Sequence, residues 1–231
     1  MAERKIAIVG TAPSSRDLAP YDDPSWEIWG ISPFNHNLMG RWDVWFELHD
    51  AKMFLEQGWD PGFWEWMQKQ EKPIYLQEKQ KDIPASIKFP KDKLLKAFPM
   101  AAERNFFQSS ISWMIALAIV EGATEIGVWG VDMARDSEYA EEKPSCTYFL
   151  GIAEGRGVKV HLPIESDLMH SVGLYGFDDT STMKAGLRSR DQELEQRING
   201  AQAIIQDKQN EVFYLKGARD DIKYMMNNWC V

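Results

Sequence analysis

"IAIVGTAPSS", residues 6–15, places four apolar residues before a glycine and follows it with small and hydroxyl-bearing residues and one proline. Such an apolar run is typical of a strand buried on both faces, as in a parallel sheet covered by helices. In the turn, Gly10 would let the backbone approach a ligand closely, and Pro13 suits a first helical turn. Ser14 and Ser15 offer hydroxyls beside the free N–H groups of a helix start. We therefore expect an anionic ligand there, most simply a phosphate; a plain turn with a serine cap is the alternative.

Further short apolar runs end in glycine or polar residues. They are WEIWGIS (26–32), WDVWFELHD (42–50), PIYLQ (73–77), EIGVWGVD (125–132) and VKVHLP (158–163). Between them, SSISWMIALAIVEG predicts a helix that Ser109 or Ser110 caps and that Gly122 follows. Because strands and helices alternate, we expect an α/β fold over residues 1–165: a Rossmann-like parallel sheet with helices on both faces.

The last part of the chain has a different period. Eleven positions step by alternating fours and threes, and nine of them are apolar: Leu194, Ile198, Ala201, Ile205, Lys208, Val212, Leu215, Arg219, Ile222, Met226 and Trp229. This heptad pattern predicts a long C-terminal helical, coiled-coil-like tail at 184–231, which follows a linker or arm at 166–183. We expect the tail to make the protein a homo-oligomer. Two alternatives are a helix that folds back on its own domain and a hairpin broken at Gly200 or Gly217.

Charge and cysteine content exclude several functions. The 231 residues carry a net charge of −9, which argues against sequence-independent DNA binding and against an acidic membrane surface. The two cysteines, Cys146 and Cys230, lack metal-ligand spacing. The N-terminus does not read as a secretion signal, and no apolar run approaches the roughly 18 residues of a membrane span. We therefore expect a cytoplasmic protein with no membrane contact.

Polar side chains close several of the predicted strands, and ligands of open parallel sheets bind at that edge. Glu47, His49 and Asp50 follow the third run, and Asp132 follows the fifth. An imidazole titrates near neutral pH and suits proton abstraction from a hydroxyl, and carboxylates can hold Mg²⁺ against a diphosphate. We name His49, Asp50 and Asp132 as candidate catalytic residues, with Asp132 and Asp50 as candidate Mg²⁺ ligands. The alternative is that these side chains merely satisfy neighbouring backbone groups.

Two residues of the segment EEKPSC (141–146) also carry possible chemistry. Lys143 could neutralise a phosphate, or it could be a solvated surface charge. For Cys146 we expect a buried, inert thiol rather than a nucleophile, because the sequence offers it no evident histidine partner.

Taken in order, these motifs resemble a known group of enzymes. IVGTAPSSRDL (8–18) is similar to the first loop of the 6-hydroxymethylpterin diphosphokinase-like family and of the bacterial lipooligosaccharide sialyltransferases. WGISPFNHN (29–37) resembles the asparagine-containing second loop of the sialyltransferases, and FFQSSISWMIALAIVEGATEIGVWGVDM (106–133) resembles their serine-led helix and terminal G-x-D. The whole chain also resembles uncharacterised bacteriophage proteins, above all in EYAEEKPSCTYFLGIAEGRGVKVHLPIESDL (138–168).

The resemblance implies a nucleotide- or nucleotide-sugar-dependent transferase, for glycosyl or diphosphoryl transfer, encoded by a phage and working in the host cytoplasm. It implies that Asn35 lies near the base or sugar and that Ser109 or Ser110 contacts a phosphate. The expected nucleotide-binding residues are Gly10, Thr11, Ala12, Pro13, Ser14, Ser15, Ser32, Asn35, Gln108, Ser109, Ser110 and Lys143.

The sequence departs from the sialyltransferases at one point. Their general-base histidine, in a glycine-histidine-serine context after the G-x-D segment, has no counterpart in EEKPSCTYF (141–149). His49 or His36 could replace it. Two other functions stay open: a non-catalytic module that captures a nucleotide or signalling molecule, and an oligomeric interaction protein on a degenerate Rossmann scaffold.

Overall fold

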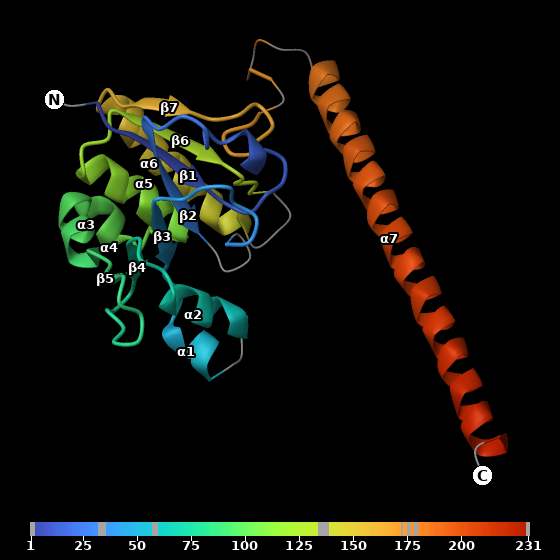
Figure 1. Ribbon diagram of the computed structural model, residues 1–231. Helices are drawn as coiled ribbons and strands as arrows, with labels where there is room; N and C mark the ends of the chain where they lie inside the picture. The colour runs from blue at the N-terminus through green and yellow to red at the C-terminus, as the bar shows by residue number, and fades with distance from the viewer. Residues whose placement is uncertain are drawn as a thin grey trace. The chain divides into compact units, whose positions relative to one another are not determined.

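The computed structural model describes residues 3–31, 36–56, 60–133, 139–171, 173–174, 177 and 180–229. The chain divides into two compact units, Met1–His170 and Ser171–Val231. We call the first the sheet unit and the second the helix unit, because the first contains the described strands and the second contains one long helix (Figure 1).

The sheet unit is built on a seven-stranded sheet in which every pair of neighbouring strands is parallel. Its strands are β1 (Lys5–Val9), β2 (Trp26–Ile31), β3 (Val44–Glu47), β4 (Ile74–Leu76), β5 (Ser86–Lys88), β6 (Glu125–Trp129) and β7 (Lys159–His161). The strand order is β5-β4-β3-β2-β1-β6-β7. The predicted α/β, Rossmann-like parallel sheet is therefore confirmed.

Helices and turns cover the two faces of the sheet. They are η1 (Arg16–Leu18), α1 (Ala51–Leu55), α2 (Pro61–Gln68), α3 (Lys91–Ala97), α4 (Pro99–Glu103), α5 (Ser110–Val120) and α6 (Tyr139–Gly155). On one face, Ile6, Ile8 and Phe46 pack in a core cluster with residues of α3–α6. On the other face, Trp45 packs with residues of α1 and α2. Figure 1 shows α5 and α6 beside the central strands and α1 and α2 beyond β4.

Helix α5 has the termini that the sequence predicts. Ser109 is its N-cap: the Ser109 hydroxyl accepts a hydrogen bond from the backbone N–H of Ser112, and the Ser112 hydroxyl completes the capping box. Gly122 follows the end of the helix with a left-handed φ of 78°. Residues 114–118 of this helix are fully buried, which agrees with a helix inside an α/β core rather than at its surface.

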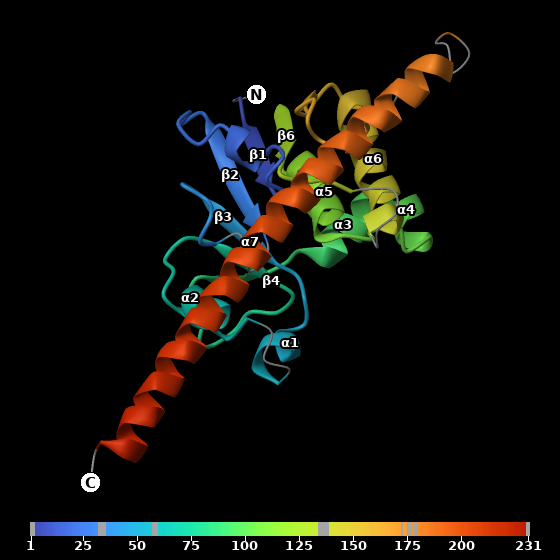
Figure 2. The same ribbon diagram turned by 90° about the vertical axis from the view of Figure 1, so that its right-hand side faces the viewer.

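The helix unit contains α7 (Thr180–Asn228), one α-helix of 49 residues. At 1.5 Å per residue, it spans about 73 Å. It runs without a break through Gly200 and Gly217, as Figure 2 shows, so the hairpin alternative is wrong. Among the helices of the described residues, none is both long enough and apolar enough for a membrane span.

Candidate functional site

The strand order reverses between β1 and β6, because β2 to β5 follow on one side of β1 and β6 and β7 lie on the other. In open α/β sheets, ligands bind outside the carboxyl ends of the strands at this reversal. Residues 10–15 leave β1 there, and residues 130–132 leave β6. Because α5 runs back before β6 and α6 runs back after it, both helices begin at this carboxyl edge. The fold therefore brings most of the sequence-predicted site residues to one edge of the sheet.

The two loops at the reversal are bonded to each other. The backbone N–H of Gly10 donates to the carbonyl of Trp129 at 2.8 Å, and that of Ala12 donates to the carbonyl of Gly130 at 2.8 Å. The N–H of Gly130 donates to the Ser15 hydroxyl at 2.9 Å. Ser15 is 1% exposed and is therefore a structural residue in this arrangement.

Gly10 is required by this loop contact. A Cβ atom at Gly10 would lie 2.4 Å from the carbonyl oxygen of Gly130, a distance that real Cβ atoms do not show. We expected Gly10 to allow close approach of a ligand, and the structure instead gives the space to the chain itself. The absence of a side chain at Gly10 is explained by the close packing of the two loops.

The turn after β1 also differs from the expected helix start. It leads into η1, a 3-10 helix of three residues, and not into an α-helix. Thr11 and Pro13 are exposed on this turn, and the carbonyl of Thr11 accepts a hydrogen bond from the Arg16 guanidinium. A three-residue helix does not present the aligned N–H groups that attract an anion, so that reason for a phosphate at this loop is lost.

Several buried polar atoms at the carboxyl edge have no hydrogen-bond partner among the described residues. They are the Ser14 hydroxyl oxygen, Oε2 of Glu47 and Oδ1 of Asp132. The other two such atoms of the described chain are the hydroxyl of Tyr21 and the indole nitrogen of Trp45. An unsatisfied buried polar atom costs about 1–3 kcal/mol, so these three oxygens are candidate contacts for a ligand at this edge.

His49 and Glu47 form a tightly bonded pair at the end of β3. Oε1 of Glu47 lies 2.5 Å from Nδ1 of His49 and also accepts the backbone N–H of His49 at 2.9 Å. The Glu47 side chain is 2% exposed, whereas that of His49 is 44% exposed. The hydrogen bond from His49 to Glu47 raises the pKa of the imidazole, against the opposing effect of burial. A buried carboxylate that fixes a partly exposed imidazole is the arrangement of a general base and its orienting residue.

A pocket of about 90 Å³ lies beside this pair, at the carboxyl ends of β3 and β4. Its lining includes Glu47, His49, Phe54, Trp64, Gln77 and Glu78. Gln77 and Glu78 were not among the predicted site residues. Gln77 ends the run PIYLQ (73–77) and both residues directly follow β4, so the rule that selected His49 and Asp132 also applies to them.

Asp50 has a structural role. Its carboxylate accepts the backbone N–H of Lys52 at 3.0 Å and caps helix α1. In the part of the chain that the structure describes, no three His, Cys, Asp or Glu side chains are grouped so that they could hold a metal ion. The Mg²⁺ site expected at Asp50 and Asp132 stays a prediction, and the capping bond gives Asp50 a role within the fold.

The predicted residues at the starts of α5 and α6 are mostly bonded within the protein. The Ser109 hydroxyl lies 3.2 Å from Sγ of Cys146. Burial raises the pKa of the Cys146 thiol to about 11, so the thiol is inert near neutral pH, as expected. Nζ of Lys143 donates to the carbonyl of Asp167 at 2.5 Å, and the Gln108 amide donates to the carbonyl of Asn105. Ser110 is the first residue of α5.

Three further predicted residues need to be placed. Ser32 and Asn35 lie outside the described residues. His36 lies against the rings of Phe63 and Trp66, with centroids 5.3 Å and 5.1 Å away. His36 is therefore part of the aromatic cluster around α2, and His49 is the better placed of the two candidate bases.

The end of β3 is electrostatically linked to the start of α6. The carboxylate of Glu142, in the first turn of α6, contributes to raising the pKa of both His49 and Cys146. Since Cys146 contacts Ser109 at the start of α5, the His49 pair and the two helix starts belong to one region of the carboxyl edge. No local pattern around Glu142 points to this role.

No family model matches the chain, and no curated protein matches it in sequence. Among solved structures, the chain is similar to the sialyltransferase CstII from Campylobacter jejuni in complex with cytidine-5'-monophosphate, at 17% identity over 69% of this chain and 79% of that one, with a TM-score of 0.46. It is also similar to the same enzyme in complex with CMP-3FNeuAc, at 19% identity over 69% and 80% of the chains, with a TM-score of 0.46. An alpha-2,3-sialyltransferase from Campylobacter jejuni in apo form matches at 16% identity over 69% and 75%, with a TM-score of 0.45.

These values describe a distant likeness of chain fold and assign no activity to this chain. The solved structures belong to the sialyltransferases that the sequence motifs resemble. The likeness to the diphosphokinase-like family and a bacteriophage origin stay predictions.

Proposed function

We propose that the sheet unit is a nucleotide- or nucleotide-sugar-dependent transferase whose ligand lies along the carboxyl edge, from the β1 and β6 loops to the end of β3. The observation that carries the proposal is the pair of His49 with buried Glu47, at the same edge as the unpartnered atoms of Ser14 and Asp132. The edge between β1 and β3 is two strand spacings wide, roughly 10 Å, a span that a nucleotide with its transferable group can bridge.

In the proposed reaction, the nucleotide lies beside Ser14 and Asp132, which gain hydrogen bonds to it. His49 takes the proton from an acceptor hydroxyl. The acceptor oxygen forms a bond to the transferred glycosyl or phosphoryl group, while the bond from that group to the nucleotide phosphate breaks and its electron pair leaves with the phosphate. Glu47 holds the imidazole in place and stabilises the imidazolium that forms.

The pH dependence of turnover follows from the protonation state that His49 needs as a base. His49 accepts a proton only when it is neutral, and its hydrogen bond to Glu47 raises its pKa. Turnover should therefore rise with pH through this raised pKa and reach its plateau above it.

The test begins with the ligand. Mass spectrometry of small molecules that copurify with the protein, followed by calorimetric titration with nucleotides and nucleotide sugars, should identify a nucleotide that binds. Product analysis with that nucleotide and a set of hydroxyl acceptors should then detect transfer. His49→Ala should lower turnover by about 10²- to 10⁴-fold at similar nucleotide affinity. His170→Ala, a change at an exposed histidine, is the matched control and should have no effect.

Three outcomes are informative. Transfer that persists in His49→Ala would contradict the assigned base. Binding without transfer across the acceptor set would favour a capture module. An absence of binding to every nucleotide tested would contradict the proposal as a whole.

A further inference from the structure

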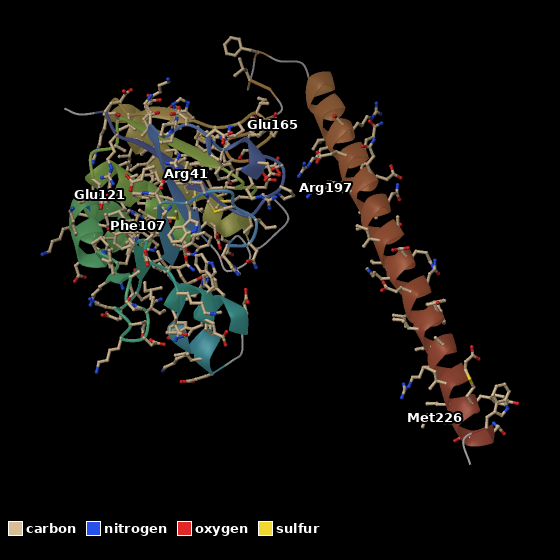
Figure 3. All side chains as sticks on the ribbon, in the orientation of Figure 1. Arg41, Phe107, Glu121, Glu165, Arg197 and Met226 are labelled. Atoms are coloured by element: carbon tan, nitrogen blue, oxygen red, sulfur yellow. The ribbon has the colours of Figure 1, made fainter. Side chains whose placement is uncertain are left out.

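The apolar stripe of helix α7 has no explanation within the helix unit. Its large apolar members from Leu194 to Trp229 are between 42% and 73% exposed. Figure 3 shows side chains standing out from α7 on several sides, with Arg197 and Met226 labelled. A stripe of this length exceeds what soluble proteins usually leave exposed, so a partner surface is needed.

We infer that α7 pairs with α7 of a second copy of this chain as a parallel, in-register, two-stranded coiled coil. This inference is independent of the proposed function, because it rests on the helix unit alone. In the heptad register of the stripe, Ile198, Ile205 and Val212 occupy a positions. Leu194 and Leu215 occupy d positions, and the other d positions hold Ala201, Lys208, Ile222 and Trp229. Three β-branched residues at a together with the two leucines at d favour two strands over three or four.

The flanking charges favour the parallel direction. In a parallel pair, each g residue faces the e residue five positions later on the partner. Arg190 at g then faces a second Glu195, and Glu211 at g faces a second Lys216, so both pairs are attractive. The remaining g and e pairs of residues 190–223 each contain at least one uncharged side chain, and none brings like charges together.

Two charged residues interrupt the apolar layers of the stripe, Lys208 and Arg219, and Lys208 is bonded to Glu211 of its own helix at 2.7 Å. In register, each faces its own copy, so two layers bring like charges together and lower the stability of the pair. Equal register is favoured instead by the flanking charges, because a shift by one heptad would leave only two attractive g and e contacts in place of four.

The glycines of the helix do not interfere with this pairing. Gly200 lies at a c position and Gly217 at an f position, both away from the seam. A Cβ atom added at either glycine would meet no other atom within 4 Å. The seam is therefore continuous, although each glycine weakens the helix itself.

The test uses the full-length chain with Cys230→Ser, to remove the cysteine near the C-terminus. Ala201→Cys places a thiol at a d position, where it faces its own copy only if the helices are parallel and in register. Asn210→Cys, at an outward f position, is the matched control. Paired thiols meet at an effective concentration on the order of millimolar, so at micromolar protein Ala201→Cys should form disulfide-linked dimers on the order of a hundredfold faster than Asn210→Cys.

A second measurement tests whether the flanking charges at g and e pair between the two helices. Lys216→Glu would face Glu211 of the partner and should raise the dimer dissociation constant roughly tenfold, and the added change Glu211→Lys should restore dimer formation. Light scattering should give a dimer for the unmodified chain. A monomer, a trimer, or crosslinking of Ala201→Cys only when it is mixed with Val212→Cys, which marks an antiparallel pair, would each overturn the inference.

Discussion

At the amino edge of the sheet, where the strands begin, charged side chains pair with one another, whereas at the carboxyl edge several buried polar atoms have no partner among the described residues. Arg4, just before β1, bonds Glu27 at 3.0 Å and Glu121 at 2.9 Å. The Glu125 carboxylate bonds Lys5 at 3.1 Å and His161 at 2.5 Å. Figure 3 labels Glu121, at the end of α5 on this edge.

The carboxyl edge differs in how many of its buried polar atoms are hydrogen-bonded. Ser14, Glu47 and Asp132 each hold a buried oxygen without a partner in the described chain. Folding alone gains nothing from such atoms, because each lost its water without receiving a replacement. The amino edge therefore stabilises the fold, whereas the carboxyl edge holds the residues that we propose contact a ligand.

The largest expected effect concerns the contact between the loops that follow β1 and β6 at the carboxyl edge. Gly10→Val would drive a side chain into the carbonyl of Gly130, so we expect the free energy of unfolding to fall by about 3 kcal/mol or more. Urea unfolding measures it. The matched control is Gly151→Val, because a Cβ at Gly151 of α6 meets nothing within 4 Å. Equal stability of the two variants would show that the loops do not need this glycine.

The next effect belongs to the amino edge. Glu125→Gln removes a carboxylate that serves Lys5, Lys159 and His161, and should lower the free energy of unfolding by about 1.5–3 kcal/mol at pH 7. Burial alone would raise the pKa of Glu125, but its hydrogen bonds to His161 and Lys5 lower it to about 2.

The pH dependence of that loss has a definite sign. Because the folded pKa is lowered, the stabilisation by Glu125 is complete above the ordinary value of 4.5 and is lost as the pH falls from there towards 2. The difference in stability between the unmodified chain and Glu125→Gln should shrink over this range. A difference that stays constant down to pH 2 would contradict the assignment.

A smaller effect, of opposite sign, is expected at the carboxyl edge. Ser14→Ala removes a buried oxygen that has no partner in the described residues, so stability without ligand should stay unchanged or rise by up to about 1 kcal/mol. Thermal and urea unfolding of the ligand-free protein measure it. A clear loss of stability would mean that Ser14 serves the fold.

The smallest expected effect is a shift in the pH at which His49 titrates. Glu47→Gln removes the carboxylate that raises the pKa of His49, so the imidazole should titrate at lower pH than in the unmodified chain. Proton NMR of the histidine ring signals follows this directly. An unchanged His49 titration would contradict the electrostatic coupling within the pair.

Much of the fold could be predicted from local sequence. The apolar runs correspond to β1, β2, β3, β4, β6 and β7, and the serine cap and Gly122 mark the ends of α5. Strand β5 could not be found this way, because it is a three-residue edge strand in which Ile87 is 42% exposed and no apolar run forms. The heptad pattern likewise predicted a long helix over 184–231, and the helix starts four residues earlier, at Thr180.

The site was predictable only in part. The rule that polar residues follow strands selected His49 and Asp132, which do lie at the carboxyl edge. It could not reveal that Ser15 bonds Gly130, 115 residues away, or that Ser109 contacts Cys146. Such contacts depend on which strands become neighbours, and no local pattern near Ser15 or Ser109 encodes that.

The most direct test of the division between the two edges is to measure nucleotide affinity and stability together in two variants. With a nucleotide that the unmodified protein binds, Asp132→Asn should weaken binding by roughly 10- to 100-fold while the ligand-free stability stays within about 0.5 kcal/mol of the original. Glu125→Gln should do the reverse, with lower stability and unchanged affinity. Unchanged affinity in Asp132→Asn, or an equal loss of affinity in both variants, would contradict a ligand site at the carboxyl edge.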